Sequence, residues 1–357
     1  MSEKAQLVND FNQNGIGLTG RLFGLPYSLE ESQLVIVPLP WEVTVSSQTG
    51  TAKGPEKIIE VSSEIELFSK EISEVWKLKI ASLDLPKEIK KKSDQLRSLA
   101  ALHIQSLESG KEEESSQIIT QKVNEGCENL NVYVNQVTRD LFMEGKMVGL
   151  LGGDHSTPLG LLRTLNEKFS NFGILQIDAH ADLRKSYQNF KYSHGSIMFN
   201  ALKLKNLSRL VQVGVRDFCE EEYLLMQKST GRVKAFFDSD IKEQLFNGKP
   251  WGLICQEVID TLPDLVYISF DIDGLRPELC PNTGTPVPGG LSFEEATYLI
   301  KQVVLSGKRI IAFDLSEVSG LRNWDAQVGS RILFELCNWM AVSQGRLKLT
   351  NKANVDL

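Results

Sequence analysis

Eight short runs of hydrophobic, often β-branched residues recur along the chain. Amphipathic stretches of helical length separate most of them, for example residues 158–169, 220–229 and 292–306. Nearly continuous hydrophobic strands that alternate with helices are typical of a mainly parallel sheet covered on both faces. The runs that we expect to form its strands are 34–39, 79–85, 147–153, 172–178, 209–215, 233–237, 265–271 and 309–314.

Residues 86–146 interrupt this alternation. The segment is rich in Lys, Glu, Ser and Gln, and it holds His103 within a helical pattern. We interpret it as a helical elaboration with a solvated, charged face, broken near residues 106–116, rather than as a dedicated binding site. The tail from Gly345 onward is expected to be short and frayed. The sequence has no internal repeat and no clear interdomain linker, so residues 1–357 are predicted to form one domain.

Composition narrows the classes of partner. The chain of 357 residues has a formal net charge of -7 and a pI near 5.4, which argues against a nucleic-acid or anionic-membrane partner. No stretch approaches the roughly 18 consecutive apolar residues that span a bilayer, and the N-terminus has no hydrophobic signal segment. The five cysteines are scattered without a CxxC pair, so we expect reduced, half-buried thiols in a cytoplasmic protein.

Ionisable side chains follow four of the predicted strands. The run 172–178 leads into Asp178, His180 and Asp182, whose spacing of two residues points all three side chains the same way on an extended chain. Ligands of open α/β sheets bind outside the carboxyl ends of the strands, so we expect all four ends to converge on one polar site. At the other three ends, the run 147–153 is followed by His155, the run 265–271 leads into Asp271 and Asp273, and the run 309–314 leads into Asp314 and Glu317.

A cluster of this kind needs a positive charge at its centre, because unneutralised acidic groups are costly to bury. Each motif alone has a simpler explanation, such as a loop cap or a salt bridge, but a structural role does not account for all of them together. Four aspartates and two histidines without sulfur suit two divalent ions such as Mn²⁺ better than structural zinc. Two such ions share a bound water whose pKa falls to about 7, which predicts a hydrolase. Fe²⁺, Co²⁺ and Ni²⁺ accept similar ligand sets.

The motifs GGDHS (152–156), DAHAD (178–182) and SFDID (269–273), in this order, resemble the metal-binding motifs of the ureohydrolases, which include arginase and agmatinase. Three further stretches are also similar to family motifs: TGTAKGPEKI (49–58), NTGTPVPGGLS (282–292) and FDLSEV (313–318). The resemblance therefore spans roughly residues 30–340. It implies a three-layer α/β/α sandwich on a mainly parallel, eight-stranded sheet, and self-association into trimers or hexamers.

The resemblance also implies a role for each polar residue. Two of the six metal ligands would bridge both Mn²⁺ ions, and the other four would bind one ion each. His155 and Asp182 would bind one ion only, and His180 and Asp273 would bind the other only. The bridging ligands would be Asp178 and Asp271, of which Asp178 is the one expected to matter most for catalysis. Glu317 would pair with the guanidinium group of the substrate, and His194 would contact substrate and shuttle a proton. Asp314 would either assist substrate binding or cap its strand.

The loop LRKSYQNFKYSHGSIMF (183–199) follows the second motif, where arginases carry Asn and Ser residues that recognise arginine. This loop lacks that set and is more similar to the loop of agmatinases, which favours hydrolysis of agmatine to putrescine and urea. Other ureohydrolase activities stay open as alternatives, namely arginase, guanidinobutyrase, guanidine hydrolase and formiminoglutamase, as does a catalytically silent family member. Arg276, Val287 and the stretch 316–325 depart from the family pattern. We expect Arg276 to face solvent, with attraction of a substrate carboxylate as the alternative.

Overall fold

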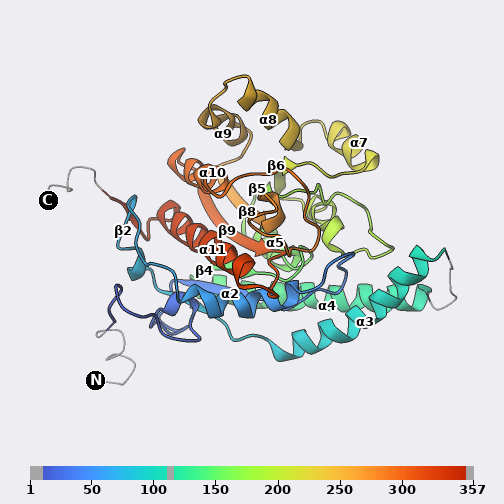
Figure 1. Cartoon of the computed structure of the whole chain (residues 1–357), viewed down its shortest axis with the longest axis horizontal. Coiled ribbons are helices and arrows are strands. Elements are labelled where there is room, and N and C mark those ends of the chain that lie inside the picture. Colours follow the sequence, from blue (N-terminus) through green and yellow to red (C-terminus); the bar gives the residue numbers. More distant parts are fainter. Residues whose placement is uncertain (1–10, 111–115, 351–357) are drawn as a thin grey trace.

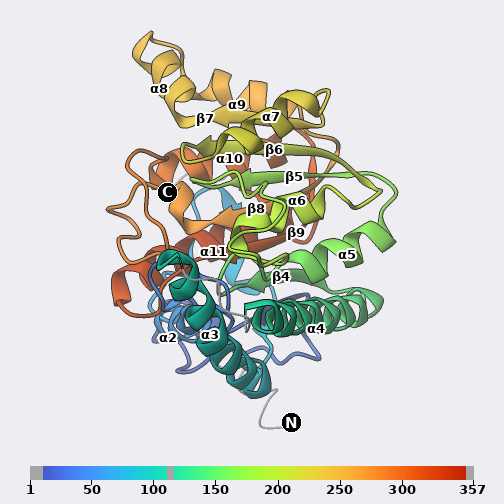
Figure 2. The same cartoon turned by 90° about the vertical axis from the view of Figure 1, so that its right-hand side faces the viewer.

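The computed structural model describes residues 11–110 and 116–350. Within them, all eight predicted runs form strands of a single sheet in the order β3-β1-β4-β9-β8-β5-β6-β7, and every neighbouring pair is parallel. Figure 2 shows the strands from β7 to β4 stacked one below the other. Their bounds are Leu34–Pro38 (β1), Ile80–Ser82 (β3), Met147–Leu151 (β4), Phe172–Ile177 (β5), Leu207–Val215 (β6), Val233–Phe237 (β7), Leu265–Asp271 (β8) and Arg309–Ser316 (β9). The predicted eight-stranded, mainly parallel sheet is therefore confirmed.

Helices cover both faces of the sheet, which gives the predicted three-layer α/β/α sandwich (Figure 1). A central strand such as β4 supplies both cores, because successive side chains alternate between the faces: Met147 and Leu151 of β4 lie in one core, Val148 and Leu150 in the other. One core is closed by α2 (Gly54–Ser62), α8 (Asp238–Phe246), α9 (Trp251–Asp260), α10 (Phe293–Leu305) and α11 (Asn323–Ser343). The other is closed by α3 (Lys87–Glu108), α4 (Ser116–Met143), α5 (Leu159–Lys168), α6 (Ile197–Ala201) and α7 (Glu220–Lys228).

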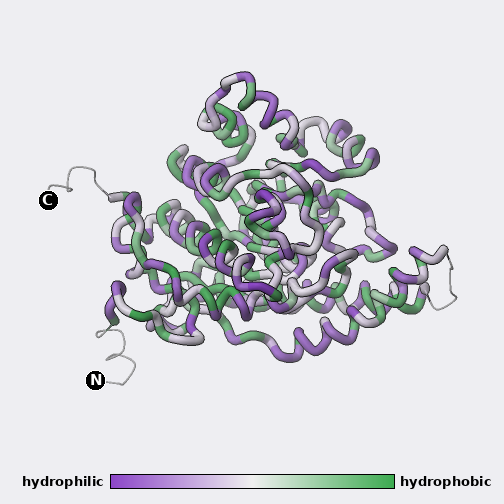
Figure 3. Tube along the Cα trace, viewed as in Figure 1, coloured by the Kyte–Doolittle hydropathy of each residue, from purple (hydrophilic) through white to green (hydrophobic). Residues whose placement is uncertain are grey.

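The segment 86–146 is helical, as predicted, and forms the long pair α3 and α4, which lie side by side (Figure 1). The break between them includes residues 111–115, which lie outside the described part of the chain. The outer side of α3 is largely hydrophilic (Figure 3), whereas Leu96 and Ala100 enter the core. His103 is also buried, with 1% of its surface exposed, so it does not belong to the solvated face.

Of the local features predicted elsewhere, the helix cap is confirmed and the frayed tail is not. The N-terminus of α10 has the predicted capping box, in which Ser292 Oγ accepts from the Glu295 N–H at 3.1 Å. The prediction of a frayed tail is wrong for Lys348–Leu349, because this strand, β10, pairs antiparallel with β2 (Ile72–Ser73). Residues 351–357 lie outside the described part. The five cysteines are free, four buried and one half-buried. No helix among the described residues is both long and apolar enough to cross a membrane.

Candidate metal centre

Four neighbouring strands, β4, β9, β8 and β5, bring the predicted ligands to one edge of the sheet. In the register of these strands, Leu151 pairs with Leu315, Leu315 with Phe270, and Phe270 with Ile177. The ligand-bearing segments lie beyond this row, at the end of β8 and just after β4 and β5, so their side chains emerge together at the carboxyl edge. Motifs that lie far apart in the sequence meet here because their strands are neighbours in space.

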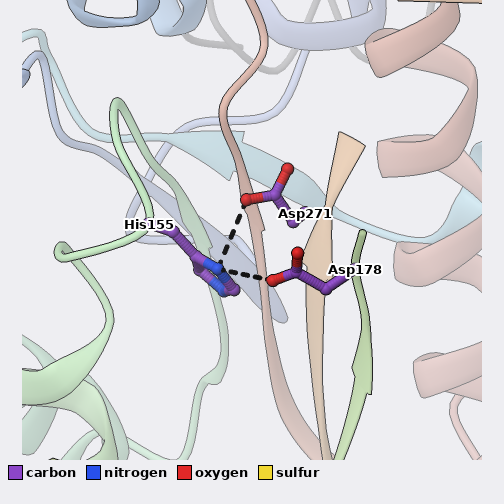
Figure 4. Close-up of side chains that lie close together, drawn as sticks. All are labelled: His155, Asp178 and Asp271. Atoms are coloured by element: carbon purple, nitrogen blue, oxygen red, sulfur yellow. Dashed lines mark ion pairs between the residues drawn. The ribbon is translucent and has the colours of Figure 1, made fainter. Parts of the chain in front are cut away.

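A first group of ligands converges on His155 (Figure 4). Nδ1 of His155 lies 3.0 Å from an oxygen of Asp178 and 3.3 Å from an oxygen of Asp271. It also lies 2.9 Å from Asp182 Oδ2. None of these contacts has hydrogen-bond alignment, and Nδ1 has no hydrogen-bond partner among the described residues. One nitrogen and three oxygens that converge in this way form a donor set suited to a cation.

A second group lies beside the first and shares one residue with it. Nδ1 of His180 lies 3.1 Å from Asp273 Oδ2 and 3.6 Å from Asp178 Oδ1. Asp178 thus turns Oδ2 to the first group and Oδ1 to the second, as expected of a bridging ligand. Within residues 11–110 and 116–350, two sets could each hold a metal ion, namely His155, Asp178 and Asp271, and Asp178, His180 and Asp273. Asp271 belongs to the first set alone, so its bridging role stays a prediction.

Burial gives this cluster strongly shifted pKa values. Desolvation raises the pKa of Asp182 to about 7, with the charge of Asp178 adding to it. Desolvation likewise raises the pKa of Asp271 well above its usual range. For His180, burial lowers the pKa, but Asp273 and Asp178 outweigh it and raise the pKa to about 12. Nitrogen and oxygen donors without sulfur, buried with an excess of carboxylates, fit a pair of divalent cations.

Metal binding should therefore release protons. His180 and Asp182 hold protons near neutral pH in the ion-free chain, and ligands must be deprotonated to bind metal. We expect the Mn²⁺ affinity to rise with pH between about 6 and 8, by about tenfold per pH unit for each proton released. Titration calorimetry in buffers of different ionisation enthalpy counts these protons. An affinity that does not change over this range would contradict the assigned ligands.

Asp314 lies behind the first group and not in a substrate channel. Its Oδ1 accepts from the Ser269 hydroxyl at 2.8 Å and from the Tyr267 hydroxyl at 2.5 Å, and its Oδ2 accepts from the Ser316 hydroxyl at 2.9 Å. Ser269 Oγ is in turn 2.8 Å from His155 Nε2, the nitrogen that faces away from the cluster. Asp314 is fully buried by these contacts, so of the two roles left open for it, substrate binding and a structural one, its position favours the structural one. It orients a ligand through a second hydrogen bond, as carboxylates near metal-binding histidines do.

Two buried glutamines, which the sequence analysis did not single out, support the shared aspartate. Gln176 Nε2 donates to Asp178 Oδ2 at 2.7 Å, and Gln212 Nε2 donates to Gln176 Oε1 at 2.6 Å. Gln212 Nε2 also lies 2.7 Å from the carbonyl oxygen of Ala181, inside the second motif. A signal was present, because glutamines inside otherwise apolar strands need partners. Which partners they meet depends on the pairing of Gln176 with Gln212 across β5 and β6.

Comparison with known proteins assigns this arrangement to a family. The model of the arginase family matches residues 32–338. The chain belongs to the arginase family. N(1)-aminopropylagmatine ureohydrolase of Thermus thermophilus is 31% identical over 294 residues, which cover 82% of this chain and 84% of that protein. Agmatinase of Bacillus anthracis is 27% identical over 300 residues, covering 82% and 85%. The solved agmatine ureohydrolase of Thermoplasma volcanium matches with a TM-score of 0.69 at 23% identity, over 96% of this chain and 99% of that one.

Membership of the arginase family confirms the predicted resemblance, the fold and the enzyme class: the chain is a hydrolase that acts on guanidino C–N bonds. The family match also shows that the similarity extends well beyond the three metal motifs. The family does not determine the substrate or the identity of the ions. The residues around the cluster provide information on both.

Glu317 presents a buried carboxylate oxygen without a partner. Its Oε1 accepts from the His155 N–H at 2.8 Å, but Oε2 has no hydrogen-bond partner among the described residues. Desolvation raises the pKa of this carboxyl well above its usual range. Its φ of 62° is in the left-handed region, which costs a non-glycine residue about 1–3 kcal/mol. A strained backbone and an unpaired buried oxygen suit a residue that receives a cationic group.

His194 lies on the wall of a cavity of about 440 Å³ that also reaches the candidate metal ligands His180 and Asp182. Its Nε2 is 3.5 Å from Ser46 Oγ, and its ring packs edge-on against Tyr187 with centroids 5.6 Å apart. Burial, followed by the charge of the neighbouring His180, lowers the pKa of His194 to about 3. The imidazole is therefore neutral at neutral pH in the ion-free chain. The structure brings it beside the cluster, where its predicted role requires it.

Two of the residues that depart from the family pattern, Arg276 and Val287, differ in their relation to the cavity. Arg276 is 45% exposed at its side chain and lies 3.9 Å from Glu295, outside the residues that line the cavity, as expected of a solvent-facing cation. Val287 lines the cavity, and its carbonyl oxygen accepts from the Arg216 guanidinium at 3.0 Å. Arg216 also donates to the carbonyl oxygen of Asp273 at 2.7 Å, so it ties this rim to a metal ligand. The sequence analysis did not identify Arg216.

Proposed function

We propose that this enzyme hydrolyses the guanidinium group of a linear compound with a cationic tail, giving urea and an amine, with two Mn²⁺ ions. Agmatine, which would yield putrescine, is the first candidate, and N(1)-aminopropylagmatine, named in a 31% identical relative, is the second. The single observation that carries the proposal is the cavity in which the metal ligands His180 and Asp182 meet an acidic wall.

The charge of the cavity wall favours a cationic tail over a carboxylate. Asp217 and Glu222 contribute carboxylates to the lining. Arg184 is the one Lys or Arg among the described lining residues, and its Nε lies 3.8 Å from Glu222 Oε2 while its guanidinium stacks over Tyr187 at 5.0 Å. The charges of Arg184 and Glu222 therefore offset each other, which leaves Asp217 as the carboxylate available to a cationic tail. A carboxylate tail, as in guanidinobutyrate or formiminoglutamate, would meet like charge here without a free cation to pair with.

The residues of the chain divide the chemistry between them. The free Oε2 of Glu317 would accept hydrogen bonds from the substrate guanidinium, for which a carboxylate is the best-matched partner. His194, which shares the cavity wall with His180 and Asp182, would contact the substrate and pass a proton to the leaving nitrogen. His155, Asp178, His180, Asp182, Asp271 and Asp273 would hold the ions.

The chemistry that divalent ions supply in such a site is a lowered pKa of a bound water, to about 7. Mn²⁺ is the proposed ion because the donors are carboxylates and imidazoles, and Fe²⁺, Co²⁺ and Ni²⁺ are the alternatives to test. A cytoplasmic location and assembly into trimers or hexamers stay predictions.

A substrate panel tests the proposal. Protein loaded with Mn²⁺ is assayed against agmatine, N(1)-aminopropylagmatine, arginine, guanidinobutyrate, guanidine and formiminoglutamate, with separate detection of urea and formamide. We expect urea, and a kcat/KM for the two compounds with cationic tails at least about 100-fold above that for the carboxylates, because an unpaired buried charge is costly. Formamide as the main product, or a preference for guanidinobutyrate, would contradict the proposed substrate class. Full metal loading without turnover of any compound would favour the catalytically silent alternative.

A further inference from the structure

The loop that lines the cavity after the second metal motif has a tip that does not hold its shape by itself. Tyr187 and Phe190 exchange two backbone hydrogen bonds, at 3.0 and 2.8 Å, which makes a hairpin with Gln188 and Asn189 at the turn. These two residues have φ of 50° and 67°. A two-residue turn of this kind prefers Asn or Gly, and Gln is disfavoured there. Contacts from outside the loop must therefore stabilise it.

The helix α3 supplies the main contact, through a histidine that the metal centre does not use. Nε2 of His103 lies 3.1 Å from the carbonyl oxygen of Gln188, and Nδ1 lies 3.2 Å from Ser116 Oγ. Because a carbonyl oxygen only accepts, Nε2 carries the proton, and Nδ1 accepts from the serine hydroxyl. The imidazole also packs edge-on against Phe190, with centroids 5.3 Å apart. His103 thus fixes both the turn and the residue that follows it.

The helix α4 holds the other side of the same loop. Asn124 Oδ1 accepts from the backbone N–H of Lys191 at 2.7 Å. The side chain of Phe190 is fully buried, and it belongs to the same core cluster as Ala100 of α3 and Val123 of α4. The hairpin is therefore seated on the pair α3 and α4 by two polar contacts and one buried ring.

The same helix pair also holds a second loop of the cavity. Arg97 of α3 donates to the carbonyl oxygen of Val45 at 2.6 Å, and Ser93 Oγ accepts from the N–H of Glu42 at 3.0 Å. The residues directly after Val45, at positions 46–48, line the cavity. Two segments of the substrate-facing wall, 46–48 and 184–194, thus rest on α3.

We propose that α3 and α4 form part of the substrate site, with His103 and Arg97 as positioning residues for the two wall loops. The expected effect on KM rests on the proposed function, whereas the expected effect on the order of the two loops does not. His103 acts through the hairpin, which carries Tyr187 into the cavity. His194, at the far end of the loop, has its own support, because its N–H lies 3.4 Å from Thr44 Oγ1. His103 therefore governs substrate binding more than turnover.

Four variants test this: His103→Ala, His103→Gln, Arg97→Met and Thr138→Ala. His103→Ala removes the donor to Gln188, and His103→Gln restores a side-chain N–H. Thr138→Ala is the matched control, since Thr138 is buried in α4 and bonds to Val134 and Thr164, away from both loops. Two readouts are measured on metal-loaded full-length protein, namely amide hydrogen exchange across 184–194 and 42–48, and kcat and KM for agmatine.

For His103→Ala we expect exchange of the 186–192 amides to rise at least about tenfold, and KM to rise at least about fivefold while kcat stays within about threefold. His103→Gln should restore most of both, Arg97→Met should loosen 42–48, and Thr138→Ala should change neither loop. Unchanged exchange of 184–194 in His103→Ala, or equal loosening by Thr138→Ala, would overturn the inference. If wild-type protein does not turn over agmatine, the proposed substrate fails while the exchange result still decides this inference.

Discussion

Asp178→Asn is expected to remove nearly all turnover and most of the bound metal. The two carboxylate oxygens of Asp178 face different histidines, His155 and His180, so one substitution weakens both ion sites. Changes one layer behind a metal ligand typically cost about 10- to 100-fold in affinity or activity, and a shared ligand should cost more than that. Metal content by inductively coupled plasma mass spectrometry, measured with urea release, checks both parts.

Asp314→Asn is the graded comparison for this prediction. It makes the same chemical change at a buried carboxylate that lies behind His155, bonded to it through Ser269 and 3.8 Å from its Nε2. We expect it to keep two ions at saturating metal and to lose about 10- to 100-fold in metal affinity or activity. Two ions and full turnover in Asp178→Asn would show that the shared site is wrong. Equal losses in both variants would mean that the effect comes from folding rather than from ligation.

The strands and their convergence could be predicted because the signals are local. A parallel strand buried on both faces is a continuous hydrophobic run, and all eight such runs entered the sheet. The polar residues after four of them had to meet once those strands became neighbours. The motifs fixed which residues meet, but not the order of the strands, which came from the resemblance and from the structure.

The position of Asp314 could not be predicted, because the sequence does not show where strand β9 ends. The run was predicted to end at residue 314, but β9 continues to Ser316. Asp314 is therefore inside the strand, paired in register with Ser269, and only Glu317 lies beyond the edge. Because β9 runs two residues further than predicted, Asp314 lies below the edge of the sheet, and Glu317 is the acidic residue that follows the strand. Hydrophobicity cannot set that boundary, because Asp314 and Ser316 are polar although both are buried.

The contacts between the helix pair α3 and α4 and the loop 184–194 could not be predicted from the sequence either. The pattern of α3 shows that one of its faces is buried, yet it does not show that His103 meets a carbonyl group 85 positions away. The same holds for Asn124 and Lys191. Such contacts depend on where a loop rests on a helix pair, and that is decided by packing in three dimensions.

Glu317→Gln is expected to lower kcat/KM by about 10²- to 10³-fold without loss of metal. Truncating one partner of a buried charge pair costs about 3–5 kcal/mol, and the free Oε2 is the oxygen that would pair with the guanidinium. Glutamine keeps the acceptor for the His155 N–H, so the metal ligand should stay in place. Steady-state kinetics and metal content on the same preparation separate the two effects.

Stability supplies an independent measurement for Glu317. Burial raises the pKa of this carboxyl above that of an unfolded glutamate. The buried carboxyl therefore costs the metal-free protein no folding stability below about pH 4.3, where it is protonated in both states, and it lowers the free energy of unfolding increasingly as the pH rises. Metal-free Glu317→Gln should therefore unfold at a higher temperature than wild type at neutral pH, and the difference should shrink toward low pH. Glu335→Gln is the matched comparison, because burial also raises the pKa of this carboxyl on α11, which accepts from Trp339 Nε1, so this variant should change stability in the same direction but leave kcat/KM unchanged. A variant at Glu317 that is less stable at neutral pH, or that keeps wild-type kcat/KM, would assign this carboxylate a structural role instead.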